Sequence, residues 1–373
     1  MKKGQFILRK SEIMILFNSL VDLGYDRNIQ ISIPLLNNLM LCTLQIKSSG
    51  AHISDFISFQ DYKKTYIPLT KKMKSNAKKE VPEYIDIHNA LHQSGILKLS
   101  GGKKLEDLIS MLKKQDVLRG GDVYYIALDT NMLRDRFFNN YLSNIPPHPN
   151  LDYILCETVR DELKNRNEKY KRHTLRGMNP LPYGILETCF LNQNCLDDRM
   201  RYIGFLEYNL MRGATSCEEI ETISKKSSAY NDRVILDAYS DFVDVGRKVI
   251  FISRDNEAIR MMTGEENVIP ILFEYQPFSD EDFQAPWDRF FTFLYILGIL
   301  FGKLNIIVGG IEICSIYGVW RGKDVTEWEE EMSFLDVFKP SNNDKEEIKD
   351  YQFIMSKLTS NISLLRKLQD LDL

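Results

Sequence analysis

The pattern of hydrophobic and polar positions changes character near residue 121 of this chain. Upstream, apolar residues recur at helical spacing, as Ile13, Leu16, Phe17 and Leu20 do. Downstream, short apolar runs of strand length alternate with segments of helical periodicity. Because strands separated by helices pair in parallel through right-handed crossovers, the downstream pattern predicts a domain with a central parallel sheet.

The elements of this downstream region can be placed individually. Each expected strand is a mostly apolar run, and the expected helices lie between strands. We expect strands at 123–128, 152–156, 248–253 and 268–272, and helices near 131–141, 158–170, 232–243 and 256–262.

Beyond Pro277 the pattern changes again. Leu304–Val308 and Ile311–Trp320 flank Gly309-Gly310, an arrangement typical of a β-hairpin. The apolar run Phe290–Phe301 has about 12 residues, whereas a membrane-spanning helix needs about 20. We therefore expect a buried core segment there and no membrane contact.

The last stretch of the chain is predicted to form an amphipathic helix. Its apolar residues share one stripe: Tyr351, Ile354, Met355, Leu358, Ile362 and Leu365. Such a stripe usually packs on its own chain, and a homodimer contact is the alternative.

These changes of pattern predict three consecutive segments. Residues 1–120 would form a basic, mainly helical accessory domain, and residues 121–275 an α/β domain with an insertion between about 165 and 230. Residues 276–373 would form a smaller α+β region that contains the hairpin and the terminal helix.

Charge is distributed unevenly along the 373 residues. The formal net charge is -4, but residues 1–120 hold about 19 lysines and arginines against about 11 acids, roughly +8. A basic front and an acidic rear suit a protein that meets a polyanion with one face.

One tract of the basic front is rich in lysine and tyrosine. It contains Tyr62, Lys63, Lys64, Tyr66, Lys71, Lys72, Lys74, Lys78 and Lys79. A solvated loop is the favoured interpretation, and a surface that contacts phosphates and stacks on bases is the alternative.

The six cysteines form no CxxC pair and no disulfide ladder. The N-terminus has too short an apolar stretch for a signal peptide. Both features are typical of reduced thiols in a cytoplasmic protein.

Carboxylates follow or adjoin the expected strands of the α/β region. Asp129 ends the buried run 124–128, and Asp255 follows the strand at 248–253. Glu162 and Asp232 lie in the first turns of expected helices that leave the same edge of the sheet. Because ligands of open α/β folds bind at that edge, a parallel sheet would gather all four acids into one pocket.

Four carboxylates in one pocket repel one another unless a cation lies among them. Oxygen ligands favour Mg²⁺ or Mn²⁺, and metals held in this way hydrolyse phosphodiesters. The alternative is that these acids cap helices, which is the favoured role for Asp232 taken alone. The four acids together favour the metal site.

At these residues the sequence resembles the PIN-domain nucleases, over roughly residues 122–275. Ile126–Asn131 resembles their opening motif, Val159–Lys164 the second, Asn231–Leu236 the Asn-Asp motif of the larger PIN domains, and Phe251–Asp255 the closing strand. The resemblance implies a three-layer α/β/α domain and a Mg²⁺- or Mn²⁺-dependent endoribonuclease.

The resemblance also implies roles for single residues. Asp129, Glu162, Asp232 and Asp255 would be the catalytic acids and would hold the metal, and a metal-activated water would attack phosphorus. Asn131 and Ser253 would orient those acids through hydrogen bonds.

Two of the acids have a neighbouring alternative. Asp237 lies five residues after Asp232, about 140° round a helix, so the two cannot point the same way. We prefer Asp232, because Ile235 and Leu236 then face the core. Glu157 is the corresponding alternative to Glu162.

A basic cluster follows Glu162. It consists of Lys164, Arg166, Lys169, Lys171, Arg172 and Arg176. A charged helix face is the default interpretation, but next to the expected metal site we favour binding of the substrate backbone. The expected partner is RNA, single-stranded or structured. A catalytically silent PIN scaffold that binds RNA or a protein, and a structure-selective DNA nuclease, remain alternatives.

Overall fold

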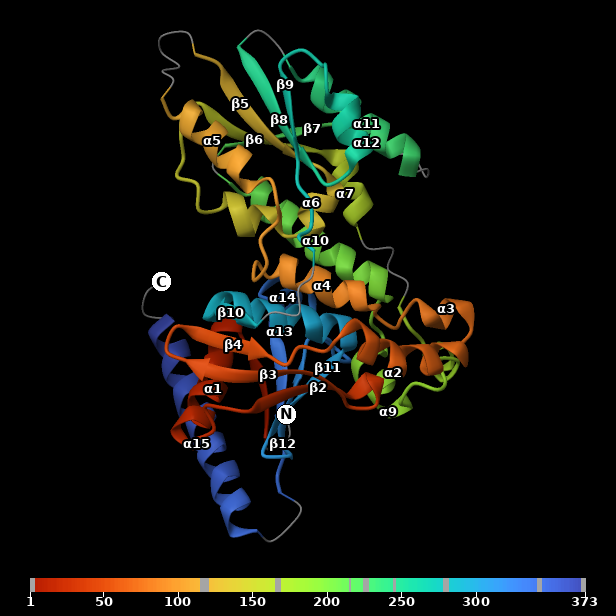
Figure 1. The fold of residues 1–373 in the computed structure, drawn as a ribbon, viewed down its shortest axis with the longest axis vertical. Coiled ribbons are helices and arrows are strands. Elements are labelled where there is room, and N and C mark those ends of the chain that lie inside the picture. The colour runs from red at the N-terminus through yellow and green to blue at the C-terminus, as the bar shows by residue number, and fades with distance from the viewer. Residues whose placement is uncertain are drawn as a thin grey trace. The chain divides into compact units, whose positions relative to one another are not determined.

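The computed structural model describes residues 4–114, 121–164, 169–214, 216–223, 228–243, 246–277, 282–340 and 344–369. It is a mixed α/β structure with one parallel and one antiparallel sheet (Figure 1).

The chain divides into two compact units. We call Leu97–Arg166 together with Asp197–Pro277 the parallel unit. Met1–Ile96, Asn167–Leu196 and Phe278–Leu373 form the antiparallel unit. Each unit is named after the sheet that it contains.

The parallel unit is built on a sheet of five strands in the order β7-β6-β5-β8-β9. Every neighbouring pair is parallel. The strands are β5 (Val123–Leu128), β6 (Leu151–Cys156), β7 (Cys217–Ile220), β8 (Arg247–Ser253) and β9 (Val268–Leu272). The chain moves outward from β5 on one side and then returns to build β8 and β9 on the other. The strand order therefore reverses between β5 and β8, which is where open α/β sheets bind ligands.

Helices surround this sheet and share its core. They are α5 (Gly102–Leu112), α6 (Thr130–Arg134), the π-helix Phe138–Leu142, α7 (Glu157–Leu163), α10 (Leu196–Arg212), α11 (Ser228–Asp241) and α12 (Asn256–Met262). Ile126, Leu128 and Ile252 are fully buried in the sheet, and Leu133 and Tyr239 pack on it from the helices. The strands predicted at 123–128, 152–156, 248–253 and 268–272 are confirmed, and so is the helix at 256–262. The helix predicted at 158–170 is shorter, because the chain leaves helical geometry at Lys164.

The antiparallel unit contains a sheet of eight strands. Their order is β1 (Gln5–Leu8), β13 (Ser333–Val337), β12 (Ile311–Tyr317), β11 (Lys303–Val308), β2 (Ile29–Ile33), β3 (Leu39–Lys47), β4 (Gly50–Ser54) and β10 (Phe283–Pro286). Strands β11 and β12 form the predicted hairpin around Gly309 and Gly310.

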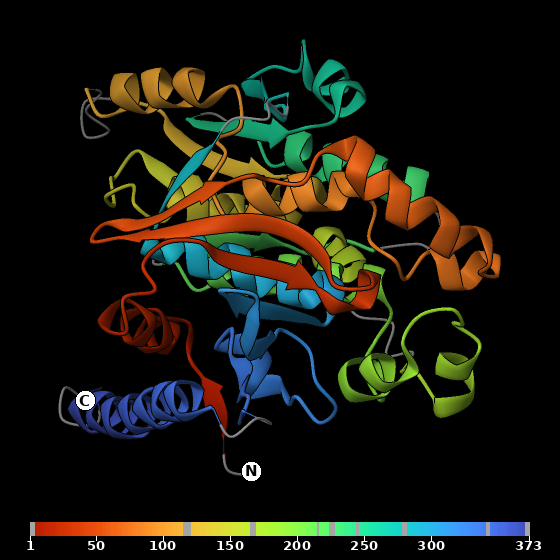
Figure 2. The same ribbon diagram turned by 60° about the horizontal axis from the view of Figure 1, so that its bottom comes forward.

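The remaining elements of this unit are helical. They are Lys10–Glu12 and Pro34–Leu36, α1 (Ile13–Asp22), α2 (Phe59–Lys71), α3 (Ser75–Lys78), α4 (Tyr84–Gln93), α8 (Arg172–Arg176), α9 (Tyr183–Phe190), α13 (Trp287–Phe301), α14 (Val325–Glu329) and α15 (Lys345–Gln369). Helix α15 packs on α1 and buries Ile354, Leu358 and Ile362, so its apolar stripe contacts its own chain (Figure 2).

The apolar helix α13 lies in the core, as the sequence predicted. Every residue from Phe290 to Phe301 is buried. A Cβ atom on Gly298 would lie 2.7 Å from the backbone nitrogen of Gly318, so only glycine permits this close approach between α13 and the chain after β12. Among the described residues no helix is both long and apolar enough to cross a membrane.

The division into units differs from the three consecutive segments predicted from the sequence. Residues 1–96 and 278–373 share one unit, and 167–196, part of the predicted insertion, belongs with them. The prediction of a mainly helical segment at 1–120 overlooked four strands between residues 5 and 54, although helices account for more of the segment than strands do. The physical reason is long-range pairing: β1 completes its hydrogen bonds with β13 from the other end of the chain.

Candidate active site

Asp129 lies where β5 ends and α6 begins. Its backbone nitrogen donates to the carbonyl of Ile252 in β8 at 3.1 Å, which fixes its position at the edge of the sheet. Its Oδ1 accepts a hydrogen bond from the backbone nitrogen of Thr130 at 2.7 Å. Its Oδ2 accepts from Asn131 Nδ2 at 2.7 Å and from the Ser253 hydroxyl at 2.5 Å. Asp129 therefore caps α6 and is held by both side chains that the sequence assigned a supporting role.

Ser253 connects Asp129 with the next acid along the chain. Its oxygen accepts hydrogen bonds from Asn131 Nδ2 at 3.2 Å and from the backbone nitrogen of Asp255 at 2.9 Å. Since the hydroxyl also donates to Asp129, its one donor and two lone pairs are all used. Asn131 Oδ1 in turn accepts from the backbone nitrogen of Arg254 at 3.2 Å. The ends of β5 and β8 are thus joined by side chains as well as by the sheet.

Glu162 lies on α7 and contacts the same cluster through Thr130. The Thr130 hydroxyl donates to Glu162 Oε2 at 2.7 Å, next to the residue whose backbone binds Asp129. Thr130 was missed as a functional residue in the sequence. The feature that could have identified Thr130 is its position directly after Asp129 at the end of β5. From that position a short side chain with a hydroxyl can reach a neighbouring helix.

Asp232 lies in the second turn of α11, because that helix begins at Ser228. The helix-capping role that was favoured for Asp232 alone therefore does not apply. Its carboxylate makes no hydrogen bond or ion pair within the described part of the chain. Asp255, in contrast, caps α12 by accepting a 2.7 Å hydrogen bond from the backbone nitrogen of Glu257.

The pKa values of Asp129 and Asp232 are each raised by the charges of neighbouring acids. Burial raises the pKa of Asp129; hydrogen bonds from Ser253 and Thr130 lower it, and the charges of Asp232 and Glu162 raise it further. Burial also raises the pKa of Asp232, and Glu162, Asp255 and Glu257 add to that rise. Asp232 therefore lies near Glu162, Asp255 and Glu257, and Asp129 lies near Asp232 and Glu162. We call these five acids the acidic cluster; sequence reasoning missed Glu257.

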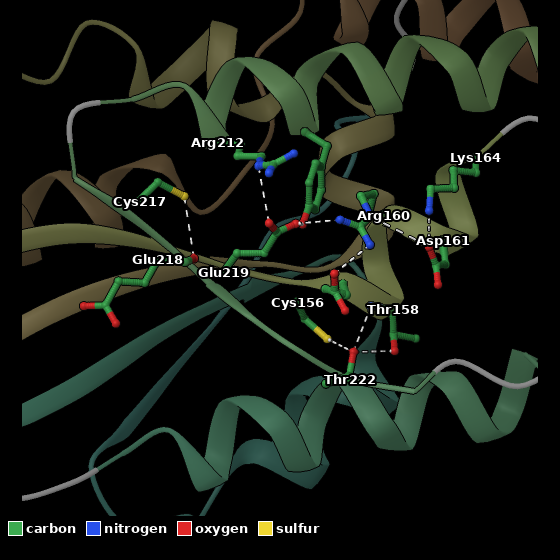
Figure 3. A network of polar contacts seen from close by, with 12 residues as sticks. Cys156, Thr158, Arg160, Asp161, Lys164, Arg212, Cys217, Glu218, Glu219 and Thr222 are labelled. Atoms are coloured by element: carbon green, nitrogen blue, oxygen red, sulfur yellow. Dashed lines mark hydrogen bonds and ion pairs between the residues drawn. The ribbon is translucent and has the colours of Figure 1, made fainter.

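The two alternative acids have other partners. Asp237 is exposed and lies 3.8 Å from Arg233 on its own helix. Glu157 forms a 2.7 Å ion pair with Arg160 (Figure 3). Neither is among the main charges that raise the pKa of Asp129 or Asp232.

The network around Arg160 anchors the helix that carries Glu162. Arg160 also pairs with Glu219 at 3.2 Å, and Glu219 accepts a 2.5 Å hydrogen bond from Tyr208 (Figure 3). At the start of the helix, the hydroxyl of Thr222 accepts from the backbone nitrogen of Thr158 at 3.0 Å. Side chains from α10, from β7 and from the chain after β7 take part in these contacts. They therefore fix the orientation of α7 on several sides.

Basic groups lie beside the acids on α6 and on the turn after β8. Burial lowers the pKa of Arg134, the neighbouring Asp197 raises it, Arg201 lowers it again, and Glu162 raises it. Arg254 forms an ion pair with the buried Asp135 and lies over the ring of Tyr275 at 4.1 Å. Neither arginine had a sequence signal that could have marked it.

The described residues of the predicted basic cluster belong to two different units. Lys164 pairs with Asp161 at 2.7 Å on α7, and Arg166 lies outside the described residues. Lys169, Lys171, Arg172 and Arg176 belong to the antiparallel unit. Of the five described residues, one therefore lies in the parallel unit and four lie in the antiparallel unit.

The donor chemistry of the acidic cluster fits a hard divalent cation. All its side-chain donors are carboxylate oxygens, which Mg²⁺ and Mn²⁺ prefer. In their present rotamers, no three His, Cys, Asp or Glu side chains of the described residues lie close enough to hold an ion. Coordination would require the carboxylates to turn toward a shared point, and Asp232 is free of hydrogen bonds that would oppose this.

Comparisons with protein families, with curated proteins and with solved structures find no match for this chain. The functional proposal therefore rests on the geometry and chemistry of the site.

Proposed function

We propose that this protein is a PIN-type endoribonuclease that hydrolyses RNA phosphodiester bonds with Mg²⁺ or Mn²⁺. In this proposal the parallel unit is the catalytic domain, with helices in layers on both faces of its sheet. One observation carries the proposal: hydrogen bonds through Ser253 and Thr130 hold Asp129, Asp255 and Glu162 together at the point where the strand order reverses. The charge of Asp232 acts on Asp129 in addition.

The residues of the cluster have distinct tasks in the proposed reaction. Asp129, Glu162, Asp232 and Asp255 would hold the cation, and Ser253, Asn131 and Thr130 keep two of these carboxylates in fixed orientations. When bound, the cation supplies a nucleophilic water at neutral pH and neutralises charge on the leaving oxygen. No side chain of the chain becomes covalently modified.

The setting of the proposed enzyme is a soluble, reducing one. All six cysteines are free thiols, which agrees with the cytoplasm. A homodimer would have to form through another surface, since the apolar stripe of α15 packs on α1.

A catalytically silent scaffold that binds RNA or protein is the second candidate. It is favoured by the absence, among the described residues, of three side chains already arranged to hold a metal. A DNA nuclease would use the same metal chemistry, so the two polymers must be compared directly.

The decisive experiment uses labelled RNA and DNA of one sequence, single-stranded and as hairpins, with Mn²⁺, Mg²⁺ or EDTA. We expect cleavage of RNA that requires the metal and falls about 100-fold or more in Asp129→Asn and in Asp232→Asn. Asp237→Asn is the matched control, since it removes the same charge from the same helix, and it should cut like the wild type.

Each other outcome points elsewhere. Binding without cleavage under every metal supports the scaffold. Preferential cleavage of DNA hairpins supports the DNA nuclease. Cleavage that survives both Asp129→Asn and Asp232→Asn rules out the assigned site.

A further inference from the structure

The antiparallel unit carries an exposed basic surface built from two segments far apart in the sequence. We call it the basic face. Its members are Lys63, Lys64, Lys71, Lys72, Lys74, Lys78 and Lys79 of α2–α3, and Lys169, Lys171, Arg172 and Arg176 at and before α8; all are exposed.

Hydrogen bonds hold the two segments side by side. Glu80, which directly follows Lys79, accepts a 2.9 Å hydrogen bond from the backbone nitrogen of Leu196. Two residues earlier, Asn194 forms a β-bridge with Lys169. In both views the helices α2 and α3 (orange) lie on the same side of the unit as residues 172–190 (yellow-green) (Figures 1 and 2).

The positive charge of this surface is poorly neutralised by the chain itself. Residues 59–79 contain seven lysines and one acid, Asp61, and residues 169–183 contain four basic residues and no acid. The ion pairs of the basic face are Lys64 with Asp61 at 2.7 Å and Arg172 with Glu187 at 3.3 Å. The other members make no ion pair with any described residue. In a chain of formal net charge -4, such a concentration of unpaired charge indicates a polyanionic partner.

Aromatic rings lie among these charges. The Phe59 ring is 45% exposed, with the Lys63 ammonium 4.2 Å from its centre. Tyr66 is half-buried and stacks on the buried Tyr62, with ring centres 5.8 Å apart. A surface with lysines and accessible rings suits single-stranded nucleic acid, because phosphates take the charges and bases stack on the rings.

The arrangement fits a membrane surface less well. Helices that lie on membranes insert an apolar face. On α2, Tyr62 and Leu69 are buried in the protein. The exposed large apolar residues of this helix are Phe59 and Ile67, which are too few for an inserted apolar face.

We propose that the basic face binds the sugar–phosphate backbone of single-stranded RNA and retains the substrate for the nuclease. The identity of this partner rests on the proposed function. The lysines of α2–α3, which the sequence favoured as a solvated loop, would be the main contacts. Residues 169–176 would extend the track on the surface of the antiparallel unit.

The test measures binding separately from cleavage. The full chain is titrated into labelled single-stranded RNA in EDTA, and fluorescence anisotropy is recorded at several salt concentrations. Each phosphate contact makes the plot of log K against log[salt] steeper by about 0.7. We expect the triple variant Lys71→Gln/Lys72→Gln/Lys74→Gln to weaken binding roughly tenfold or more and to make the slope shallower by about 2.

The matched control is Lys103→Gln/Lys104→Gln/Lys113→Gln on α5, which removes three exposed charges from the other unit. It should keep the wild-type slope. Equal weakening by both triple variants would show an effect of net charge alone and would overturn the proposal. Binding to phosphatidylserine vesicles without binding to RNA would also overturn it, in favour of a membrane surface.

A second readout separates this proposal from the nuclease assignment. If RNA binds in EDTA through the α2–α3 lysines but is never cut, the nuclease assignment fails and the basic face stands. If a short oligonucleotide is cut and the α2–α3 variant binds long RNA like the wild type, the basic face fails and the nuclease stands. Circular dichroism of each variant checks that it folds.

Discussion

The hydroxyl of Ser253 donates a 2.5 Å hydrogen bond to Oδ2 of Asp129 across 124 positions of sequence. The contact joins the C-terminal ends of β8 and β5, which are neighbours at the centre of the sheet. A residue that holds another in place acts through orientation, so its removal should lower turnover and leave the fold intact.

We therefore expect Ser253→Ala to lower kcat by about 10- to 100-fold while KM changes little. Ser253→Thr keeps the hydroxyl and should retain most of the activity. Ser110→Ala, at an exposed position on α5, is the control for the loss of a serine hydroxyl. Equal loss in the Ala and Thr variants would mean that the hydroxyl is not the group that matters.

Asp232 should destabilise the metal-free protein at neutral pH. Its pKa is raised in the folded state by burial and by Glu162, Asp255 and Glu257. Stability is therefore lost as the pH rises from the usual carboxyl range through the raised folded pKa. Asp232→Asn should raise Tm in EDTA at pH 7 and should have no such advantage at a pH low enough to protonate Asp232 in both states.

Mn²⁺ should reverse this difference. An ion that binds only the folded state stabilises it by mass action. Differential scanning fluorimetry should show a larger rise of Tm with Mn²⁺ for the wild type than for Asp232→Asn. The variant Asp237→Asn should follow the wild type in both conditions, since Asp237 is exposed and paired with Arg233. An identical metal response in all three proteins would remove Asp232 from the site.

Two acids of α7, Glu162 and Glu157, should differ in their response to loss of charge. Glu162 is held toward Asp129 by the Thr130 hydroxyl, whereas Glu157 pairs with Arg160. We expect Glu162→Gln to abolish measurable cleavage. Glu157→Gln should cut normally and lose at most about 1 kcal/mol of stability, because Arg160 retains Glu219. Both variants should be measured in the same RNA-cleavage assay. Cleavage that depends on Glu157 and not on Glu162 would contradict the prediction.

The sequence predicted most reliably those strands that are covered on both faces. Runs such as 123–128 and 248–253 are almost continuously apolar, because both faces of a central parallel strand are covered. Acids that end such runs meet at the edge of the sheet for the same reason, so Asp129 and Asp255 could be located from pattern alone. The position of Asp232 within its helix could not be predicted in this way. Helix α11 begins at Ser228, four residues earlier than the sequence pattern indicated.

Sequence reasoning failed where pairing is long-range. Ile29, Ile31 and Ile33 alternate with polar residues, which is a strand signal that was overlooked among helical patterns. The pairing of β2 with β11, more than 250 residues later, could not have been found from local pattern. For the same reason, local pattern could not show that the antiparallel unit is built from three separate parts of the chain. Nor could it show that residues 167–196 belong to that unit.

The last prediction concerns Lys323, which is buried in the antiparallel unit. Its ammonium lies 4.3 Å from the ring centre of Trp328 and 4.8 Å from that of Trp320. It also donates to the carbonyls of Gly318 at 2.7 Å and Met332 at 2.8 Å. The side chain therefore connects the end of β12 with the chain that leads into β13.

Lys323→Met fills a similar volume but leaves both carbonyls without this donor and removes the cation from the rings. Each buried carbonyl left unsatisfied costs about 1–3 kcal/mol, so we expect the free energy of unfolding to fall by about 2–4 kcal/mol in urea titrations. Lys303→Met is the control, because Lys303 also lies over aromatic rings but donates to no buried carbonyl in the described structure. A loss in Lys323→Met no larger than in Lys303→Met would show that the carbonyl contacts of Lys323 contribute nothing to stability.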